Sequence, residues 1–324
     1  MENLMYLKHF GLERNPFLLS TEAQCMYYSA SHCEATAHLL FAVRERKGIA
    51  LLLGEPGTGK TTLVKTVLEM LRPVGVVSSV IMNPMLESAQ DLLVAILNGF
   101  HLKPGNRPPL ELLNVLFSYL EDQVHLGRRP LLLVDEAQQL SSRTLEHLRL
   151  VSNLESGGHR LLQLVLSGQP EIRDKLAEPQ HGGLRQRIVV RCEIKQLASS
   201  EVWKYLALRA SRAGSDGRPI FQPEAVSVLA AASGGIPRMI NVLADNSLVA
   251  AYSAGEATVN AEQVSSIARH FELPVPMSSS IAAVGLSGST HTNEEWKKLV
   301  KDFANYEVPA ALQEFTRSMV GKTA

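Results

Sequence analysis

One segment constrains the fold more than any other. Residues 54–61 read GEPGTGKT and match the pattern GxxxxGK[ST] at every position. They follow the apolar run 49–53, typical of a strand buried on both faces, and precede a helical pattern over 61–71. In this context the backbone N–H groups curl around phosphate oxygens, and the helix N-terminus adds about half a positive charge. The sequence therefore predicts a phosphate-binding loop between a strand and a helix.

Every position of this loop is a candidate for nucleotide binding. Lys60 supplies a mobile cation for the β and γ phosphates and is a candidate catalytic residue. Thr61 supplies a hydroxyl to Mg²⁺, so the implied cofactors are ATP and Mg²⁺. The alternative, a glycine-rich turn with an exposed lysine, is disfavoured by the strand and the helix on either side. The nucleotide-binding candidates in this loop are Gly54, Glu55, Pro56, Gly57, Thr58, Gly59, Lys60, Thr61 and Thr62.

An acidic pair follows a second buried strand. Four apolar residues, 131–134, lead directly into Asp135 and Glu136. In open α/β sheets ligands bind at the carboxyl ends of the strands. We expect Asp135 to hold Mg²⁺ and nucleotide, and Glu136 to deprotonate the attacking water. The alternative is a pair of solvated acids at a strand end.

Weaker signals surround these two motifs. A polar residue after the strand 161–166 is expected to contact the γ phosphate or the water, and Gln169 is favoured over Ser167. An arginine before the last strand is expected to reach a neighbouring subunit's ATP, with Arg187 first, Arg185 second and Arg191 also open, unless this is a solvated face. Arg238, after a proline at a helix start, is expected to sense the γ phosphate or else to be a surface residue.

Strand-like and helical patterns alternate up to about residue 197, and only helical patterns follow. We expect strands at 49–53, 74–82, 131–134, 161–166 and 188–193, and helices at 34–46, 61–71, 89–100, 110–125 and 141–155. Further helices are expected at 200–213, 222–233, 237–254, 260–270, 294–303 and 310–320. The fold class is α/β, a P-loop αβα sandwich with a parallel sheet and a small all-α lid. The predicted domains are an N-terminal segment (1–47), an ATPase domain (48–197), a helical lid (198–272) and a linker with a tail (273–324).

Composition excludes several classes of protein. The 324 residues carry 32 Lys+Arg and 32 Asp+Glu, a net charge of +0, which argues against a globally basic nucleic-acid coat. The 3 cysteines form no CxxC pair, so the sequence supports neither a disulfide framework nor a zinc site. The N-terminus has no basic start followed by an apolar stretch, and the chain has no uncharged apolar run of about 18 residues. We expect a cytoplasmic protein without a membrane span.

Together these motifs resemble the AAA+ ATPases. The features are GEPGTGKTT (54–62), LLLVDEAQ (131–138), LVLSGQPE (164–171), LRQRI (184–188) and GGIPRMIN (234–241). The stretch YLKHFGLERNPF (6–17), with Tyr27, Tyr28 and HCEA (32–35), resembles more narrowly the general secretion pathway protein A (ExeA) type. That type is similar to transposition regulators of the TnsC type and to origin-recognition ATPases. The resemblance covers roughly residues 4–272.

The resemblance implies Mg-ATP hydrolysis, nucleotide-dependent assembly into a homo-oligomeric ring or filament, hexameric or helical, and an arginine finger in trans. It assigns the site to Lys60, Thr61, Asp135, Glu136, Gln169, Arg187 and Arg238. Full-length secretion proteins of this type usually continue into a transmembrane helix and a peptidoglycan-binding domain. The tail here has neither pattern, which favours a cytoplasmic ATPase.

Three functions are compatible with these features. The first is a DNA-binding ATPase switch like the transposition regulators. It is favoured by the excess of basic residues over 185–218, which could follow the phosphate backbone of double-stranded DNA. The second is an ATPase of a secretion, pilus or exopolysaccharide system that acts on envelope proteins without DNA. A slow ATP-binding scaffold is a third. Trp296, Leu299, Val300 and Phe303 share one helical face, which predicts a docking stripe for a partner protein or packing onto the lid.

Overall fold

The computed structural model describes residues 5–18, 26–82, 84–275 and 292–319. Its contacts divide the chain into two compact units, which are described separately. The sheet unit contains residues 30–56, 60–195 and 308–324. The helical unit contains residues 1–29, 57–59 and 196–307. The N-terminal segment therefore belongs to the same unit as residues 196–307, and the C-terminal segment belongs to the sheet unit.

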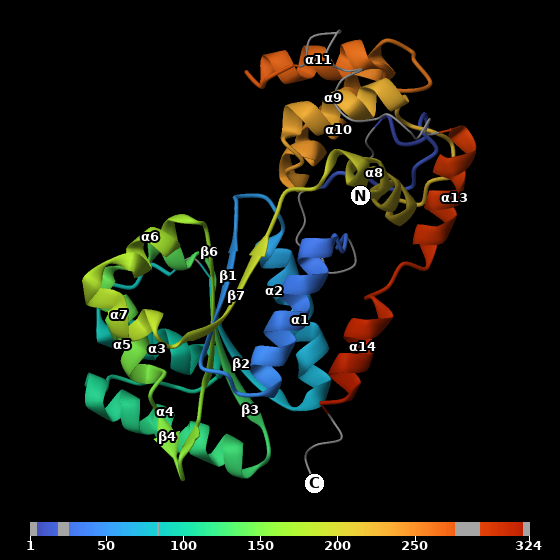
Figure 1. Ribbon diagram of the computed structural model, residues 1–324. Helices are drawn as coiled ribbons and strands as arrows, with labels where there is room; N and C mark the ends of the chain where they lie inside the picture. Colours follow the sequence, from blue (N-terminus) through green and yellow to red (C-terminus); the bar gives the residue numbers. More distant parts are fainter. Residues whose placement is uncertain (1–4, 19–25, 83, 276–291, 320–324) are drawn as a thin grey trace. The chain divides into compact units, whose positions relative to one another are not determined.

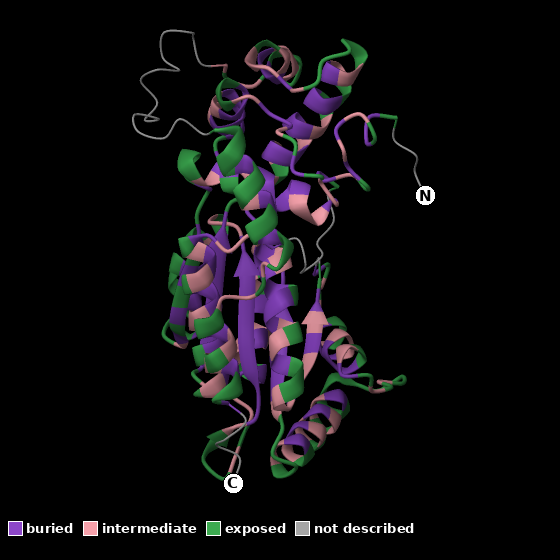
Figure 2. Ribbon diagram, turned by 90° about the vertical axis from the view of Figure 1, so that its right-hand side faces the viewer, coloured by how far each residue is buried: buried purple, intermediate pink, exposed green. Residues whose placement is uncertain are grey.

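A parallel sheet of five strands is the centre of the sheet unit. The strands are adjacent in the order β2-β3-β6-β1-β7, and every pairing between neighbours is parallel (Figure 1). Every residue of β1 and β6 is buried, as expected for central strands covered on both faces (Figure 2). The strands are β1 (Ile49–Gly54), β2 (Val76–Ile81), β3 (Arg129–Val134), β6 (Gln163–Gly168) and β7 (Ile188–Ile194).

Helices cover both faces of this sheet. Figure 1 shows α1 (Ala30–Arg44) and α2 (Lys60–Leu71) on one face, with α14 (Ala310–Arg317) packed against both of them. The other face is covered by α3 (Ala89–Gly99), α4 (Pro109–His125), α5 (Ser142–Val151), α6 (Glu171–Ala177) and α7 (Gly182–Arg185). On this second face the apolar side chains of the helices pack against the strands in one continuous core. The αβα sandwich predicted from the sequence is confirmed.

The largest error of the sequence analysis lies after α5. The helix predicted over 141–155 ends at Val151, and residues 155–160 form a small antiparallel hairpin of β4 (Glu155–Ser156) and β5 (His159–Arg160). Gly157 and Gly158 both have positive φ, at 57° and 78°. Two such residues in succession are what a tight two-residue hairpin turn requires. The helices α6 and α7 were also not predicted.

The helical unit packs the N-terminal segment into its core. Its helices are α8 (Ser199–Arg212), α9 (Pro223–Ser233), α10 (Pro237–Ser253), α11 (Ala261–His270) and α13 (Asn293–Ala304). Tyr6, Phe10 and Phe17 are buried among them. The Tyr6 hydroxyl donates to Asp245 Oδ1 at 2.5 Å, and burial beside that carboxylate raises the pKa of Tyr6. The buried side chains of the segment 5–18 are therefore part of this unit's core.

The two tail helices belong to different units. In the helical unit, Trp296 is fully buried against the Trp203 ring of α8, with the ring centroids 5.1 Å apart and an edge-to-face geometry. Val300 and Phe303 are buried in the same core. The stripe predicted as a docking surface for a partner protein is thus covered by its own chain, the alternative that the sequence left open. In the sheet unit, the guanidinium of Arg44 stacks 4.4 Å from the centroid of the Phe315 ring of α14.

From the sequence we expect neither a membrane-spanning helix nor a disulfide framework. Within the described residues, no helix combines the length and the apolar character needed to cross a bilayer. Cys33 and Cys192 form no disulfide, and burial raises the pKa of the Cys192 thiol to about 12. Cys25 lies outside the described residues.

We expect Trp296→Ala to lower the free energy of unfolding of the helical unit by about 3–5 kcal/mol, because the change leaves a large cavity against Trp203. Urea denaturation followed by far-UV circular dichroism measures this change. The matched control is Phe271→Ala in the same unit, where the side chain is 46% exposed and the expected change is within about 0.5 kcal/mol. Equal effects of the two variants would show that α13 does not stabilise this unit.

Candidate nucleotide site

The phosphate loop joins the carboxyl end of β1 to the first turn of α2. Gly57 and Gly59 have φ of 83° and 105°, a region that L side chains rarely adopt. Lys60 is the first residue of α2 and is only 5% exposed. Its ammonium donates to the carbonyl oxygens of Gly54 at 2.7 Å and Glu55 at 3.1 Å. The loop thus surrounds a buried cation with its own backbone.

Acidic side chains from other parts of the sheet unit balance this cation. Burial lowers the pKa of Lys60 from its ordinary value, because the interior disfavours the charged form. Glu136, Asp135, Glu55 and Glu171 oppose that shift through their negative charges. The site therefore holds one lysine among four carboxylates, an excess of negative charge that a divalent cation would offset.

Thr61 and Asp135 meet as the sequence predicts. The Thr61 hydroxyl donates to Asp135 Oδ2 at 2.7 Å, and Asp135 is buried directly after β3. A hydroxyl and a carboxylate in contact are hard oxygen donors, the type that Mg²⁺ prefers. The two residues therefore fit the metal that the motif implies.

Glu136 has an unusual backbone for a non-glycine residue. Its φ is 51°, in the left-handed region, and its N–H donates to Asp135 Oδ1 at 3.0 Å. Its carboxylate oxygen Oε2 accepts from Gln138 Nε2 at 2.5 Å and from Gln169 Nε2 at 3.3 Å. Among the residues that the structure describes, the other oxygen, Oε1, accepts no hydrogen bond. Two amides thus fix one oxygen of this carboxylate.

Gln138 is a site residue that the sequence analysis missed. Besides binding Glu136, its Oε1 accepts from the backbone N–H of Gln169 at 3.1 Å. Its own carbonyl accepts from Lys175 Nζ at 2.7 Å. A Cβ at Gly168 would lie 2.9 Å from Gln138 Oε1, so the glycine leaves room for this amide. The only signal in the sequence was its place two residues after Glu136.

The structure distinguishes Ser167 from Gln169, the two candidates for the polar contact with the γ phosphate or the water. Ser167 is fully buried, and its hydroxyl has no hydrogen-bond partner among the described residues. Gln169 lies at the end of β6 and contacts Glu136 directly. The arrangement favours Gln169, and its role as a sensor of the γ phosphate stays a prediction.

The candidate finger arginines lie elsewhere in the sheet unit. The carbonyl of Arg187 accepts from the N–H of Ile49, at the start of β1. The phosphate loop begins at the other end of β1, about 17 Å away for a strand of this length. Arg185 donates to the carbonyl of Ala177 at 3.3 Å, and Arg191 is exposed on β7. None of the three is placed to reach the loop of its own subunit, so a role in trans stays a prediction.

Arg238 lies at the start of α10 in the helical unit. The contacts of residues 57–59 place them in the same unit, and the Arg238 N–H donates to the Gly57 carbonyl at 3.2 Å. A Cβ at Gly57 would lie 2.8 Å from the Arg238 Cβ, which is a second reason for glycine there. The Arg238 guanidinium is exposed, and its role toward the γ phosphate stays a prediction.

The fold and the site together define a P-loop ATPase. Consistent with this, residues 43–176 match the family described as AAA domain. This chain therefore contains an AAA domain built around a phosphate-binding loop.

The narrower type follows from one curated relative. Over 252 residues the chain is 41% identical to general secretion pathway protein A of Aeromonas hydrophila, a match that covers 78% of this chain and 46% of the relative. Over this match the chain is similar to the general secretion pathway protein A type, the resemblance that the motifs indicated. It spans about half the length of that relative.

Solved structures support the same fold. The ORC2 protein of Aeropyrum pernix, in its ADPNP and ADP complexes, aligns with a TM-score of 0.63 and 17% identity over 84% of this chain and 76% of that chain. Cdc6p of Pyrobaculum aerophilum aligns with a TM-score of 0.64 and 16% identity over 95% and 89%. The RuvB branch migration motor of Thermotoga maritima gives 0.53 and 19% over 90% and 94%. At these identities the likeness concerns the fold alone.

We expect Gln138→Ala to lower kcat for ATP hydrolysis by about 10- to 100-fold with little change in KM, because the Glu136 carboxylate loses its nearest anchor. Steady-state kinetics measure both constants. The matched control is Gln139→Ala, which removes the adjacent, exposed amide and should leave both constants near wild type. A Gln138→Ala enzyme with wild-type kcat would exclude a role in positioning Glu136.

Proposed function

We propose that this protein is an ATP-driven switch of a secretion or related envelope-assembly system. In this proposal it binds Mg-ATP, assembles with copies of itself and acts on a partner protein at the cytoplasmic side, where ATP is available. The observation that carries the proposal is the 41% identity to general secretion pathway protein A over 252 residues. That relative is roughly twice as long as the match, so the partner itself is part of the proposal.

The described geometry supports a division of labour among the site residues. Lys60 neutralises the β and γ phosphates from the loop, and the hydroxyl of Thr61 with the carboxylate of Asp135 would hold Mg²⁺. When bound, Mg²⁺ neutralises charge on the phosphate oxygens. Glu136 takes a proton from the attacking water, and Oε1 is the oxygen that the described amides leave open for it.

Assembly is part of the proposal because the three candidate finger arginines make no described contact with the phosphate loop of their own chain. The candidates Arg185, Arg187 and Arg191 lie near the amino ends of β1 and β7, or along β7, away from the loop. A neighbouring copy of the chain can supply such a residue, and a finger of this kind contributes about 10³–10⁵ in rate in characterised systems. We favour Arg187 for this role.

A DNA-binding switch is the second candidate. The observation in its favour is that Arg185, Arg191 and Lys195 are exposed on the sheet unit. The basic excess over 185–218 is weaker than the sequence suggested. Arg209 is buried and donates to the carbonyls of Pro16 and Leu18, and Arg212 donates to the carbonyl of Tyr306. These two arginines stabilise the helical unit and are not available to a phosphate backbone.

We expect Glu136→Gln to bind ATP normally but to hydrolyse it at least about 100-fold more slowly, because an amide cannot accept the proton. The variant should accumulate as oligomers in Mg-ATP, which size-exclusion chromatography with light scattering measures. Asp174→Asn, an exposed acid on α6, is the control and should hydrolyse ATP like wild type. Hydrolysis by Glu136→Gln at the wild-type rate would overturn the assignment of the base.

The same Glu136→Gln protein distinguishes the two candidate functions. If the secretion proposal is right, it should not bind random double-stranded DNA at any salt concentration, although ATP still drives its assembly. A DNA switch should bind only with Mg-ATP, and binding should weaken steeply as salt rises. Fluorescence anisotropy over a salt series measures this, and ATP-dependent binding would move the assignment to the second candidate.

A further inference from the structure

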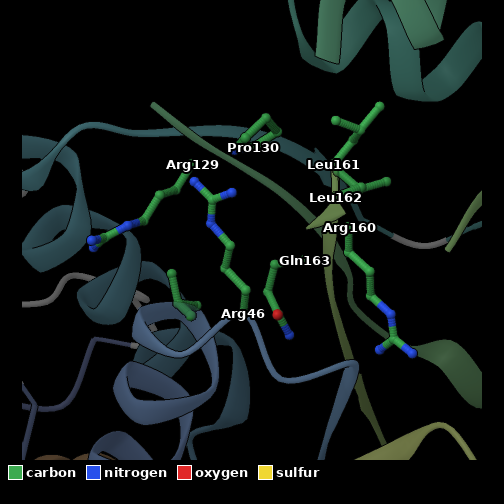
Figure 3. Close-up of a pocket in the computed structure, with 8 residues that line it drawn as sticks. Arg46, Arg129, Pro130, Arg160, Leu161, Leu162 and Gln163 are labelled. Atoms are coloured by element: carbon green, nitrogen blue, oxygen red, sulfur yellow. The ribbon is translucent and has the colours of Figure 1, made fainter. Parts of the chain in front are cut away.

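A small pocket lies at the end of the sheet opposite to the phosphate loop. Its walls come from the end of α1 and from the first residues of β3 and β6, and they include Arg46, Arg129, Arg160 and Gln163 (Figure 3). All of these residues belong to the sheet unit. Because the strands are parallel, their amino ends meet here, while Gly54 and Asp135 lie at their carboxyl ends.

The basic side chains at this pocket exceed the acids that could pair with them. Arg44 pairs with Glu45 at 2.7 Å, and Arg160 lies 3.6 Å from Glu155. Among the described residues, Arg46 and Arg129 form no ion pair. Figure 3 shows Arg46 with its guanidinium beside the base of the Arg129 side chain, Gln163 next to Arg46, and Arg160 on the far side; the Arg129 side chain extends away from Gln163 and Arg160.

The guanidinium of Arg129 is the strongest indication of a missing ligand. Its Nη1 is shut off from solvent and has no hydrogen-bond partner in the structure. A buried charge without a partner is costly, and native proteins normally pair it. Burial, together with the positive charges of Arg46 and Arg44, lowers the pKa of Arg129, and Glu45 opposes this only in part. The described residues therefore leave this corner of the molecule short of negative charge.

The backbone conformation of Arg46 and the size of the pocket limit which ligands could bind there. Arg46 has a φ of 49°, a strained region for a non-glycine residue, of the kind that recurs at ligand clamps. The free space is about 10 Å³, which holds one oxygen-sized group rather than a nucleotide. A tetrahedral phosphate offers oxygens in several directions, so it can meet guanidinium groups that come from different elements. A carboxylate offers only two oxygens in one plane.

We propose that this arginine pocket is a second anion site, which binds a phosphate group through Arg129 and Arg46. The phosphate is either free or carried by a small molecule, with one oxygen in the pocket and the rest toward solvent. Guanidinium–phosphate contacts are short, charge-assisted hydrogen bonds, which would satisfy Arg129 Nη1. This proposal does not depend on the proposed function, because the pocket shares no residue with the nucleotide site.

The test measures thermal unfolding of the full chain with Mg-ADP at saturation, so that the phosphate loop is occupied. Sodium phosphate is compared with sodium chloride at equal ionic strength. We expect phosphate at ten times its dissociation constant to raise the Tm by about 3–6 °C. Arg129→Gln and Arg46→Gln should retain only the general stabilisation that phosphate gives any protein. The control, Arg143→Gln at an exposed position on α5, should respond like wild type.

The variants give a second, independent readout. In chloride alone, Arg129→Gln should unfold at or above the wild-type Tm, because it removes a half-buried guanidinium of which Nη1 has no hydrogen-bond partner. If Arg129→Gln does not fold, Arg46→Gln alone still tests the site. Glycerol phosphate distinguishes the two sources: a shift equal to that of inorganic phosphate supports a carried phosphate, and a smaller one supports the free ion.

Two results would overturn the proposal. The first is a phosphate-dependent shift of equal size in wild type, Arg129→Gln and Arg46→Gln. The second is the absence of a phosphate-dependent shift in wild type; if DNA binding is then lost in Arg129→Gln, the pocket belongs to a nucleic-acid backbone. Loss of ATP hydrolysis in any of these variants would concern the nucleotide site only. It would not change the interpretation of the phosphate-dependent Tm shift.

Discussion

The sheet unit is organised around the buried ammonium group of Lys60. A cation with so little exposure must be compensated within the protein, and two sources do this. The first is the loop itself, because positive φ at Gly57 and Gly59 lets the chain curl so that two carbonyls face the amine. The second is the acidic pair at the end of β3. The strand order, which separates β3 from β1 by β6 alone, brings these acids within reach.

A network of amides extends this arrangement from β3 to β6. Gln138 binds the carboxylate of Glu136 with one end of its side chain and the backbone of Gln169 with the other. The carbonyls of Gln138 and Leu140 are in turn held by Lys175 from α6. A movement of the turn after β6 is therefore transmitted to Glu136 through hydrogen bonds alone. The loop supplies the charge balance of the site, and these amides supply its orientation.

The sequence predicted those parts of the site that depend on local patterns. The loop at 54–61 and the acids after an apolar run are contiguous motifs, and the rule for parallel strands brings their ends together. Gln138 was missed because two of its three partners, Gln169 and Lys175, lie more than thirty positions further along the chain. Arg209 was interpreted as surface charge for the same reason, since its partners Pro16 and Leu18 lie far away in sequence. Periodicity reports burial, but it does not say which distant segment covers a residue.

The placement of the aromatic residues has a consequence for spectroscopy. The chain has 2 tryptophans, Trp203 and Trp296, and both lie in the core of the helical unit in edge-to-face contact. Intrinsic tryptophan emission therefore originates in that unit alone, and the five-stranded sheet contributes no indole signal. An emission change on adding nucleotide would report an event in the helical unit, although most of the phosphate loop and both acids belong to the other one.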